Sequence, residues 1–117
     1  MKYLKLFEDY TIDIAISKIQ ELNFLDSEDE PIDPIKKQMA IQFVRNQFEL
    51  HSIVPFFIAP TVYQGVLIEY KHDDIRIDIR FEDSDDDFKE MIVVKSNKSL
   101  YNGVYNEEIF DSYLNLS

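Results

Sequence analysis

From Phe56 onward, apolar and polar side chains alternate along the chain, and this alternation constrains the fold more than any other feature of the sequence. Successive side chains of a β-strand point to opposite faces of a sheet, so a period of two predicts strands that bury one face. The pattern predicts four strands, over residues 56–59, 66–70, 75–82 and 88–95.

The lengths of the turns between these strands predict which residues face one another. A four-residue turn at 71–74 would place Ile68 opposite Ile77. A five-residue turn at 83–87 would place Ile77 opposite Val93. The same two registers predict the further pairs Tyr70 with Ile75, Val66 with Ile79, Glu69 with Arg76, Ile79 with Met91 and Arg80 with Glu90.

A slip of one residue in the second hairpin would place Glu90 opposite Ile79 on the core face, where burial disfavours a carboxylate. Both hairpins therefore select the same core face, which contains Ile77. We expect an antiparallel meander.

Apolar residues at helical spacing predict two helices before the strands. The first covers about residues 11–24, with Thr11 as its N-cap. The second begins at Asp33-Pro34, an N-cap acid followed by proline at the first helical position, and ends near Leu50. Its apolar stripe comprises Ile35, Met39, Ala40, Phe43, Val44 and Phe48.

A third helix is predicted after the strands. Asn102-Gly103 is a turn signal, and Asn106 can cap a helix whose stripe is Ile109, Phe110, Tyr113 and Leu114. The fold class is then α+β, as a single domain over residues 1–117. It has two N-terminal helices, a four-stranded antiparallel β-meander and a C-terminal helix. The helices should cover the sheet face formed by Ile75, Ile77, Ile79 and Phe81.

Charge is the main compositional signal, because 23 acidic residues against 12 basic ones give a net charge of −11. Such a chain is repelled by nucleic acid and by anionic membranes, so direct binding to either is not expected. Ten of the 23 acids lie in two segments, 26–33 and 82–87. We expect these acidic loops to attract a basic protein partner, chiefly through Glu28, Asp29, Glu30, Asp83, Asp85, Asp86 and Asp87. The alternative is that they only keep the chain soluble.

Candidate metal and catalytic groups are sparse. Asp83, Asp85 and Asp87 alternate as calcium ligands do, but Phe88 and Val94 stand where an EF-hand loop needs glycine and glutamate. The chain has no cysteine, which excludes a disulfide framework and a thiolate zinc site. It also shows no signal peptide or membrane span, and a cytoplasmic location is the expectation. The two histidines, His51 and His72, would need partners from distant segments. We therefore predict no metal, no cofactor and no catalytic residues.

Four residues are candidate anchors for a partner. Glu69 lies in the middle of an apolar strand, where it either pairs with Arg76 or presents a carboxylate to a partner. Tyr63, Tyr101 and Tyr105 are expected to be exposed aromatics, which commonly anchor protein interfaces.

The segment from Pro60 to Tyr70, Pro-Thr-Val-Tyr-Gln-Gly-Val-Leu-Ile-Glu-Tyr, resembles a pattern in small bacterial and phage-borne proteins, most of them uncharacterised. Those proteins read Pro-Thr-x-x-Gly-Gly-(apolar)-x-Leu-Glu-Trp, with a preceding helix and an acidic C-terminal helix. This chain has Val66 for the second glycine and Tyr70 for the tryptophan, and it has Asn23-Phe24-Leu25-Asp26 where such proteins often carry Trp-Asp-Gly-Tyr. The resemblance implies a shared fold. By analogy, it also implies a neutralising or accessory role in toxin–antitoxin or phage-defence loci.

The sequence thus predicts a non-enzymatic protein-interaction module of bacterial origin that binds a more basic protein, as an antitoxin, immunity or anti-defence protein does. One alternative is an inhibitor that mimics nucleic acid, which would need regularly spaced carboxylates along one surface. Another is a small ligand-binding or enzymatic domain that uses Glu69 and a histidine.

Overall fold

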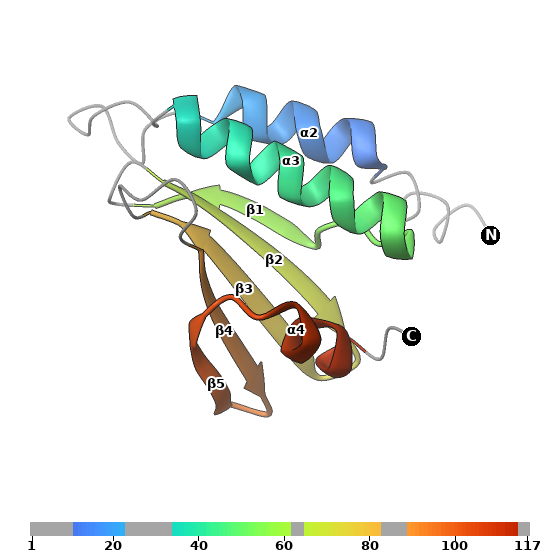
Figure 1. Cartoon of the computed structure of the whole chain (residues 1–117), viewed down its shortest axis with the longest axis vertical. Coiled ribbons are helices and arrows are strands. Elements are labelled where there is room, and N and C mark those ends of the chain that lie inside the picture. Colours follow the sequence, from blue (N-terminus) through green and yellow to red (C-terminus); the bar gives the residue numbers. More distant parts are fainter. Residues whose placement is uncertain (1–10, 23–33, 62–64, 83–88, 115–117) are drawn as a thin grey trace.

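The computed structural model describes residues 11–22, 34–61, 65–82 and 89–114 (Figure 1). Within these ranges the chain is α+β, with three helices and one antiparallel sheet of five strands in the order β1-β2-β3-β4-β5. None of the described helices is long and apolar enough to cross a membrane.

Helix α2 (Ile12–Glu21) begins as predicted, because the Thr11 hydroxyl accepts a hydrogen bond from the Ile14 amide. Ala15, Ile16 and Ile19 form its buried stripe. The helix ends earlier than the predicted residue 24, because Leu22 leaves the helical conformation with a ψ of 138°.

Helix α3 (Pro34–His51) starts at the predicted proline and runs one residue past the predicted end. Ser52, with a φ of 57°, turns the chain out of the helix. The predicted N-cap Asp33 lies outside the described residues.

The buried face of α3 differs from the predicted stripe. Ile35 is 52% exposed and Phe48 38% exposed, whereas Lys36 and Gln47 are buried. Lys36 lies four residues before Ala40, and Gln47 lies four residues after Phe43, so both share the helix face that meets the sheet. The prediction used only the positions of apolar residues, and it therefore placed the buried stripe too far around the helix.

The sheet contains β1 (Phe57–Pro60), β2 (Val66–His72), β3 (Ile75–Phe81), β4 (Glu90–Lys95) and β5 (Lys98–Val104). The predicted register of β3 with β4 is confirmed, since Ile77 pairs with Val93, Ile79 with Met91 and Arg80 with Glu90.

The predicted register of β2 with β3 is wrong by two residues. The turn contains only Asp73 and Asp74, so Ile77 pairs with Tyr70 and Ile79 with Ile68. Likewise, Val66 pairs with Phe81 and Glu69 with Asp78. Asp73 makes the tight turn possible by adopting a φ of 54°, which aspartate tolerates better than most residues. A shift of two keeps every side chain on its predicted face.

A fifth strand replaces the turn predicted at Asn102-Gly103. The chain reverses earlier, at Ser96 and Asn97, which have φ values of 50° and 68°. Strand β5 then pairs along β4, with Asn102 opposite Ile92, and a bulge interrupts the pairing between Val93 and Val94. Two consecutive residues in the left-handed conformation match the twist of a tight hairpin. The chain therefore turns at Ser96-Asn97 and not at Asn102-Gly103.

Two hydrogen bonds join Thr61, at the end of β1, to Gly65, just before β2. The Thr61 amide donates to the Gly65 carbonyl and the Gly65 amide donates to the Thr61 hydroxyl, both at 3.1 Å. A side chain at Gly65 would collide with the Phe81 carbonyl oxygen. This position therefore requires glycine.

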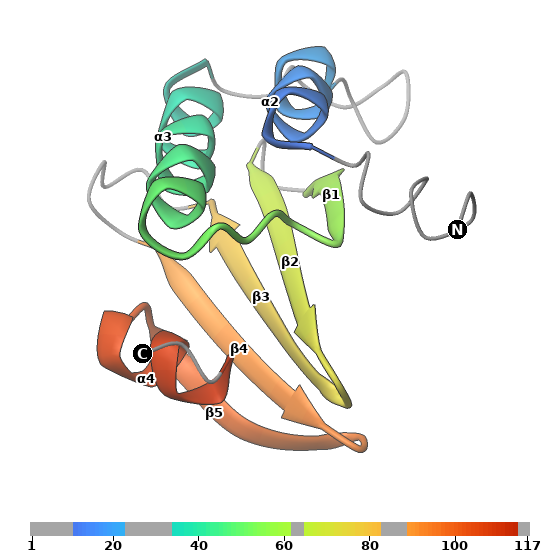
Figure 2. The same ribbon diagram turned by 90° about the vertical axis from the view of Figure 1, so that its right-hand side faces the viewer.

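All three helices pack on one face of the sheet, with α2 and α3 at one end and α4 (Glu107–Tyr113) at the other (Figure 2). Helix α4 is capped by Asn106 as predicted, and it buries Phe110. The ring of Phe43 lies at the centre of the core, 5.2–6.2 Å from the rings of Tyr70, Phe81, Tyr105 and Phe110. Ile77, Ile79 and Phe81 are completely buried and Ile75 is partly buried, so the predicted coverage of this face is confirmed.

Candidate functional site

The opposite face of the sheet is covered by none of the described helices (Figure 2). One row of directly paired residues crosses it from edge to edge: Phe57, Glu69, Asp78, Ile92 and Asn102. We call this side of the sheet the open face. The row puts two carboxylates on adjacent strands between apolar side chains.

Glu69 and Asp78 share a single arginine. The Arg76 Nε atom lies 3.3 Å from Glu69 Oε1 and 3.7 Å from Asp78 Oδ1. The carboxylate side chains are only 14% and 10% exposed, whereas that of Arg76 is 49% exposed. Asp78 Oδ1 has no hydrogen-bond partner within the described ranges. One guanidinium therefore faces two sheltered carboxylates.

The predicted contact of Glu69 with Arg76 is present, but its geometry is different from the prediction. Arg76 lies opposite Lys71 in the ladder and reaches Glu69 diagonally, because the β2–β3 turn is two residues shorter than expected. The residue directly opposite Glu69 is Asp78, which the sequence argument did not include in the site.

This arrangement holds a proton near neutral pH. The pKa of Glu69 is raised from 4.5 to about 7, first by burial and then by the hydrogen bond with Asp78 and the negative charge of Asp78. Arg76 and Lys71 lower this pKa, but their effect is smaller. A protonated Glu69 donates to Asp78, so the pair can exchange a proton or release it to bind a cation.

Exposed aromatic rings border the carboxylate pair. Phe56 is 54% exposed and Phe57 49% exposed, and the Lys71 Nζ atom lies 5.0 Å from the centre of the Phe56 ring. A hollow of about 550 Å³ extends from Phe56 and Glu69 to the tips of the two hairpins. The aspartates at the β2–β3 turn, Asp73 and Asp74, also line this hollow.

Most of the predicted acidic site lies outside the described residues. This holds for Glu28, Asp29 and Glu30 in the first acidic loop, for Asp83, Asp85, Asp86 and Asp87 in the second, and for Tyr63. The turn predicted at 83–87 also lies outside the described residues. The part of these acidic residues and of Tyr63 in binding a partner stays a prediction.

The other two predicted anchors, Tyr101 and Tyr105, are half-buried instead of exposed. The Tyr101 hydroxyl donates to the Val104 carbonyl at 2.6 Å, and the ring of Tyr105 lies 5.2 Å from that of Phe43. Both pack against the core because β5 continues the sheet through residues that were expected to turn. The most exposed aromatics of the described residues are instead Phe56 and Phe57. The alternation of strand side chains could have indicated that Phe57 points outward if the apolar Ile58 next to it points inward.

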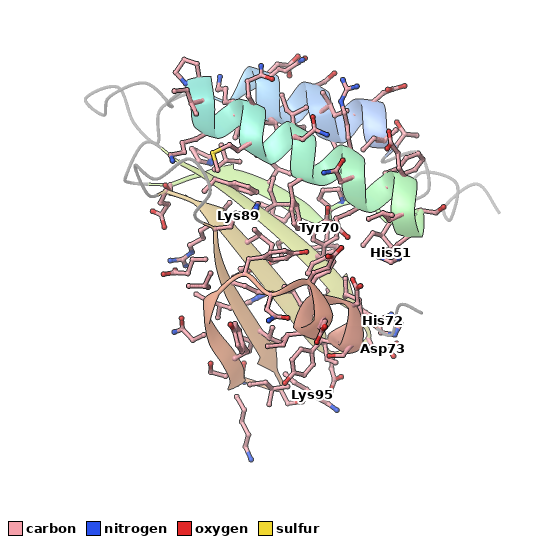
Figure 3. All side chains as sticks on the ribbon, viewed as in Figure 1. His51, Tyr70, His72, Asp73, Lys89 and Lys95 are labelled. Atoms are coloured by element: carbon pink, nitrogen blue, oxygen red, sulfur yellow. The ribbon has the colours of Figure 1, made fainter. Side chains whose placement is uncertain are left out.

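The two histidines lie at separate places (Figure 3). His51, at the end of α3, is 3.4 Å from Asp111 of α4, so a distant segment does supply its partner. His72 is exposed in the β2–β3 hairpin, 3.5 Å from its neighbour Asp73. Across the described ranges, no three histidine, aspartate or glutamate side chains cluster as metal ligands would.

Comparison of the chain with models of protein families, with curated proteins and with solved structures gives no match. The resemblance of the Pro60 to Tyr70 segment to bacterial and phage-borne proteins therefore stays a prediction. Any functional inference must come from the geometry of the chain itself.

Proposed function

We propose that this chain is a non-enzymatic protein-interaction module that binds a more basic protein through the open face of its sheet. The observation that carries the proposal is the Glu69–Asp78 pair, two sheltered carboxylates that share one arginine beside an exposed aromatic ring. Sheltered carboxylates ordinarily have matched partners. Among the described residues no second cation forms an ion pair with these carboxylates, because Lys71, whose charge also lowers the pKa of Glu69, lies against the Phe56 ring instead.

A lysine or arginine of the partner would supply that cation. It would displace the proton from Glu69 and give Asp78 Oδ1 a hydrogen-bond donor. The rings of Phe56 and Phe57 would cover the new ion pair and exclude water from it. The net charge of −11 favours encounter with a basic protein over encounter with nucleic acid or an anionic membrane.

The acidic loops have a separate role in this proposal, which is to set the rate of encounter. Neutralising Asp83, Asp85, Asp86 and Asp87 to asparagine should slow association and flatten its dependence on salt, while the dissociation rate stays nearly unchanged. An association rate unaffected by this variant and by neutralisation of Glu28, Asp29 and Glu30 would leave the loops a solubilising role only.

The proposal extends to a biological role by analogy. A small acidic protein that covers a basic partner is suited to neutralise it, as antitoxin, immunity and anti-defence proteins do in bacterial cytoplasm. Mimicry of nucleic acid is less well supported, because Arg76 and Arg80 interrupt the acidic groups on the open face.

An enzymatic or ligand-binding role for Glu69 is the second candidate, because a carboxyl group with a pKa near 7 is suited to general acid–base chemistry. The two candidates differ in what the open face contacts. A small substrate would need only the hollow beside Glu69, whereas a protein partner would also need the exposed ring of Phe57.

The test is retention of a partner from an extract of the cells that encode the chain, using wild-type protein and two matched variants. Phe57→Ser removes an exposed apolar side chain from the open face, and Ile14→Ser removes one of similar exposure, 43%, from the outer side of α2. We expect a basic protein that binds wild type and Ile14→Ser, is lost from Phe57→Ser, and elutes with salt. Equal retention by the two variants would contradict the proposal.

A further inference from the structure

Lys71 places a second ammonium beside the Glu69–Asp78 pair but directs it to an aromatic ring. Lys71 follows Glu69 by two residues on β2, so both side chains point to the open face. The Lys71 Nζ atom lies 5.0 Å from the centre of the Phe56 ring. The Phe56 amide donates to the Glu69 carbonyl at 2.7 Å, which fixes Phe56 beside β2. The ring, the ammonium and the Glu69 carboxylate therefore line one hollow.

The charges around Glu69 balance only if Lys71 is counted. Arg76 lies 3.3 Å from Glu69 and 3.7 Å from Asp78, and it is the one cation of the described residues that forms an ion pair with either carboxylate. The charge of Lys71 nevertheless lowers the pKa of Glu69. The β1 residue directly opposite Glu69 is the uncharged Phe57. The other charged groups that line the hollow are Asp73 and Asp74 of the β2–β3 turn.

Two arrangements of these groups have balanced charge. With one shared proton, the carboxylate pair has a single negative charge, which Arg76 balances, and Lys71 can remain on the ring. Without the proton, the pair has two negative charges for one guanidinium, and the second charge attracts the nearest ammonium. A hydrogen bond from an ammonium to a carboxylate is stronger than a cation–π contact at an exposed ring. The flexible stem of Lys71 allows either contact.

We propose that Lys71 is a switch that moves between the Phe56 ring and the Glu69–Asp78 pair according to whether the pair holds its proton. In the protonated state, Lys71 covers one face of the ring. When the proton passes to solvent, the Lys71 ammonium donates to the Glu69 carboxylate and uncovers that face. The open face therefore presents a ring that carries an ammonium below the transition and a bare aromatic ring above it.

The switch operates near neutral pH. Burial, and then the hydrogen bond and the negative charge of Asp78, raise the pKa of Glu69 to about 7. The proton is thus held below about pH 7 and released above it. All the groups of the switch belong to this chain, so it is independent of the proposed protein partner and its test uses the chain alone.

The first test follows the Lys71 side chain by NMR between about pH 5 and about pH 8. An aromatic ring shields protons over its face, so the Lys71 Hε resonances should lie upfield at low pH and move toward ordinary lysine values with a midpoint near 7. Lys89, whose Nζ atom lies 5.4 Å from the centre of the Tyr105 ring, is the control within the same spectra and should show no such transition. Glu69→Gln should keep Lys71 on the ring at every pH. Lys71 resonances that do not move while Glu69 titrates, or that still move in Glu69→Gln, would overturn the proposal.

The second test asks whether the ring and the proton are linked through Lys71. Phe56→Leu removes the cation–π contact, so the titration midpoint of Glu69, read from its carboxyl carbon, should fall by about half a pH unit. In the Lys71→Met background, the same Phe56→Leu change should leave the midpoint unaltered. Phe56 and Lys71 are both exposed, so these variants should fold. Equal falls in the two backgrounds would mean that the ring acts only by sheltering Glu69, and would overturn the switch.

Discussion

The two faces of the sheet shelter very different side chains to a similar degree. On the helix-covered face, Ile68, Ile77 and Ile79 are completely buried. On the open face, the Glu69 and Asp78 side chains are only 14% and 10% exposed. Burial of the isoleucines stabilises the fold, whereas burial of two carboxylates around one arginine opposes it. The proposed partner would offset this loss of stability by supplying a second cation to the pair.

The largest effect is expected for a substitution that disrupts the core on the helix-covered face. Phe43→Ala removes the ring at the centre of the aromatic cluster, and Phe43 is only 5% exposed. We expect the free energy of unfolding to fall by about 3–5 kcal/mol, the usual cost of truncating a core phenylalanine. Urea denaturation followed by circular dichroism measures it. A loss below about 1 kcal/mol would show that this residue is not central to the core.

The next effect concerns pH and the open face. The pKa of Glu69 is about 7 in the folded chain and ordinarily 4.5, so between these values the folded chain holds a proton that the unfolded chain releases. The free energy of unfolding should therefore decrease as pH rises from about 4.5 to about 7, and this contribution should total about 1–2 kcal/mol after allowance for solvent screening.

Glu69→Gln should remove this dependence, whereas the exposed-helix variant Glu49→Gln should retain it. The measurement is urea denaturation at a series of pH values between 4 and 8. A slope that is the same in wild type and Glu69→Gln would assign the proton to another group.

A smaller effect comes from the second carboxylate. Asp78→Asn removes a negative charge next to Glu69 and leaves the Glu69–Arg76 pair in place, so it should stabilise the fold at pH 8 by about 1 kcal/mol. In a double-mutant cycle with Glu69→Gln, the gain should largely disappear, because the repulsion needs both carboxylates. Additive effects in that cycle would argue against coupling of the pair.

The smallest effect is expected for the exposed ring. Phe57→Ser should change the free energy of unfolding by about 0.5 kcal/mol, because the residue lies at a sheet edge and is 49% exposed. Thermal melting of this variant beside Ile14→Ser gives the comparison. A loss as large as that of Phe43→Ala would show that the ring is structural and would remove it as a binding anchor.

Sequence reasoning succeeded where two independent constraints agreed. The β3–β4 register was predictable because Ile79 with Met91 on one face and Arg80 with Glu90 on the other both require it. The β2–β3 register was missed by two residues, because a shift of two preserves every face and only the length of the turn distinguishes the alternatives. No propensity rule shows that Asp73 will adopt the left-handed conformation that shortens this turn.

The candidate site was predictable only in part. The position of Glu69 in an apolar strand identified one carboxylate, but its partner Asp78 became visible only with the correct register. Gln47 and Lys36 were not part of the predicted apolar stripe, and their burial depends on how α3 packs on the sheet. Strand β5 escaped notice because its serine, asparagine and glycine give it little strand character, and its pairing with β4 holds it in place.

The two outer strands also limit how the sheet can grow. An unpaired strand edge is a template on which another chain can add a strand, which is a route to fibrils and to exchange of strands between copies. Strand β1 is only four residues long and ends at Pro60, which has no amide hydrogen to donate. Strand β5 begins with Lys98, and the bulge between Val93 and Val94 bends its pairing with β4. Growth from either edge is thereby discouraged, so the proposed partner would meet the open face of the sheet and not a strand edge.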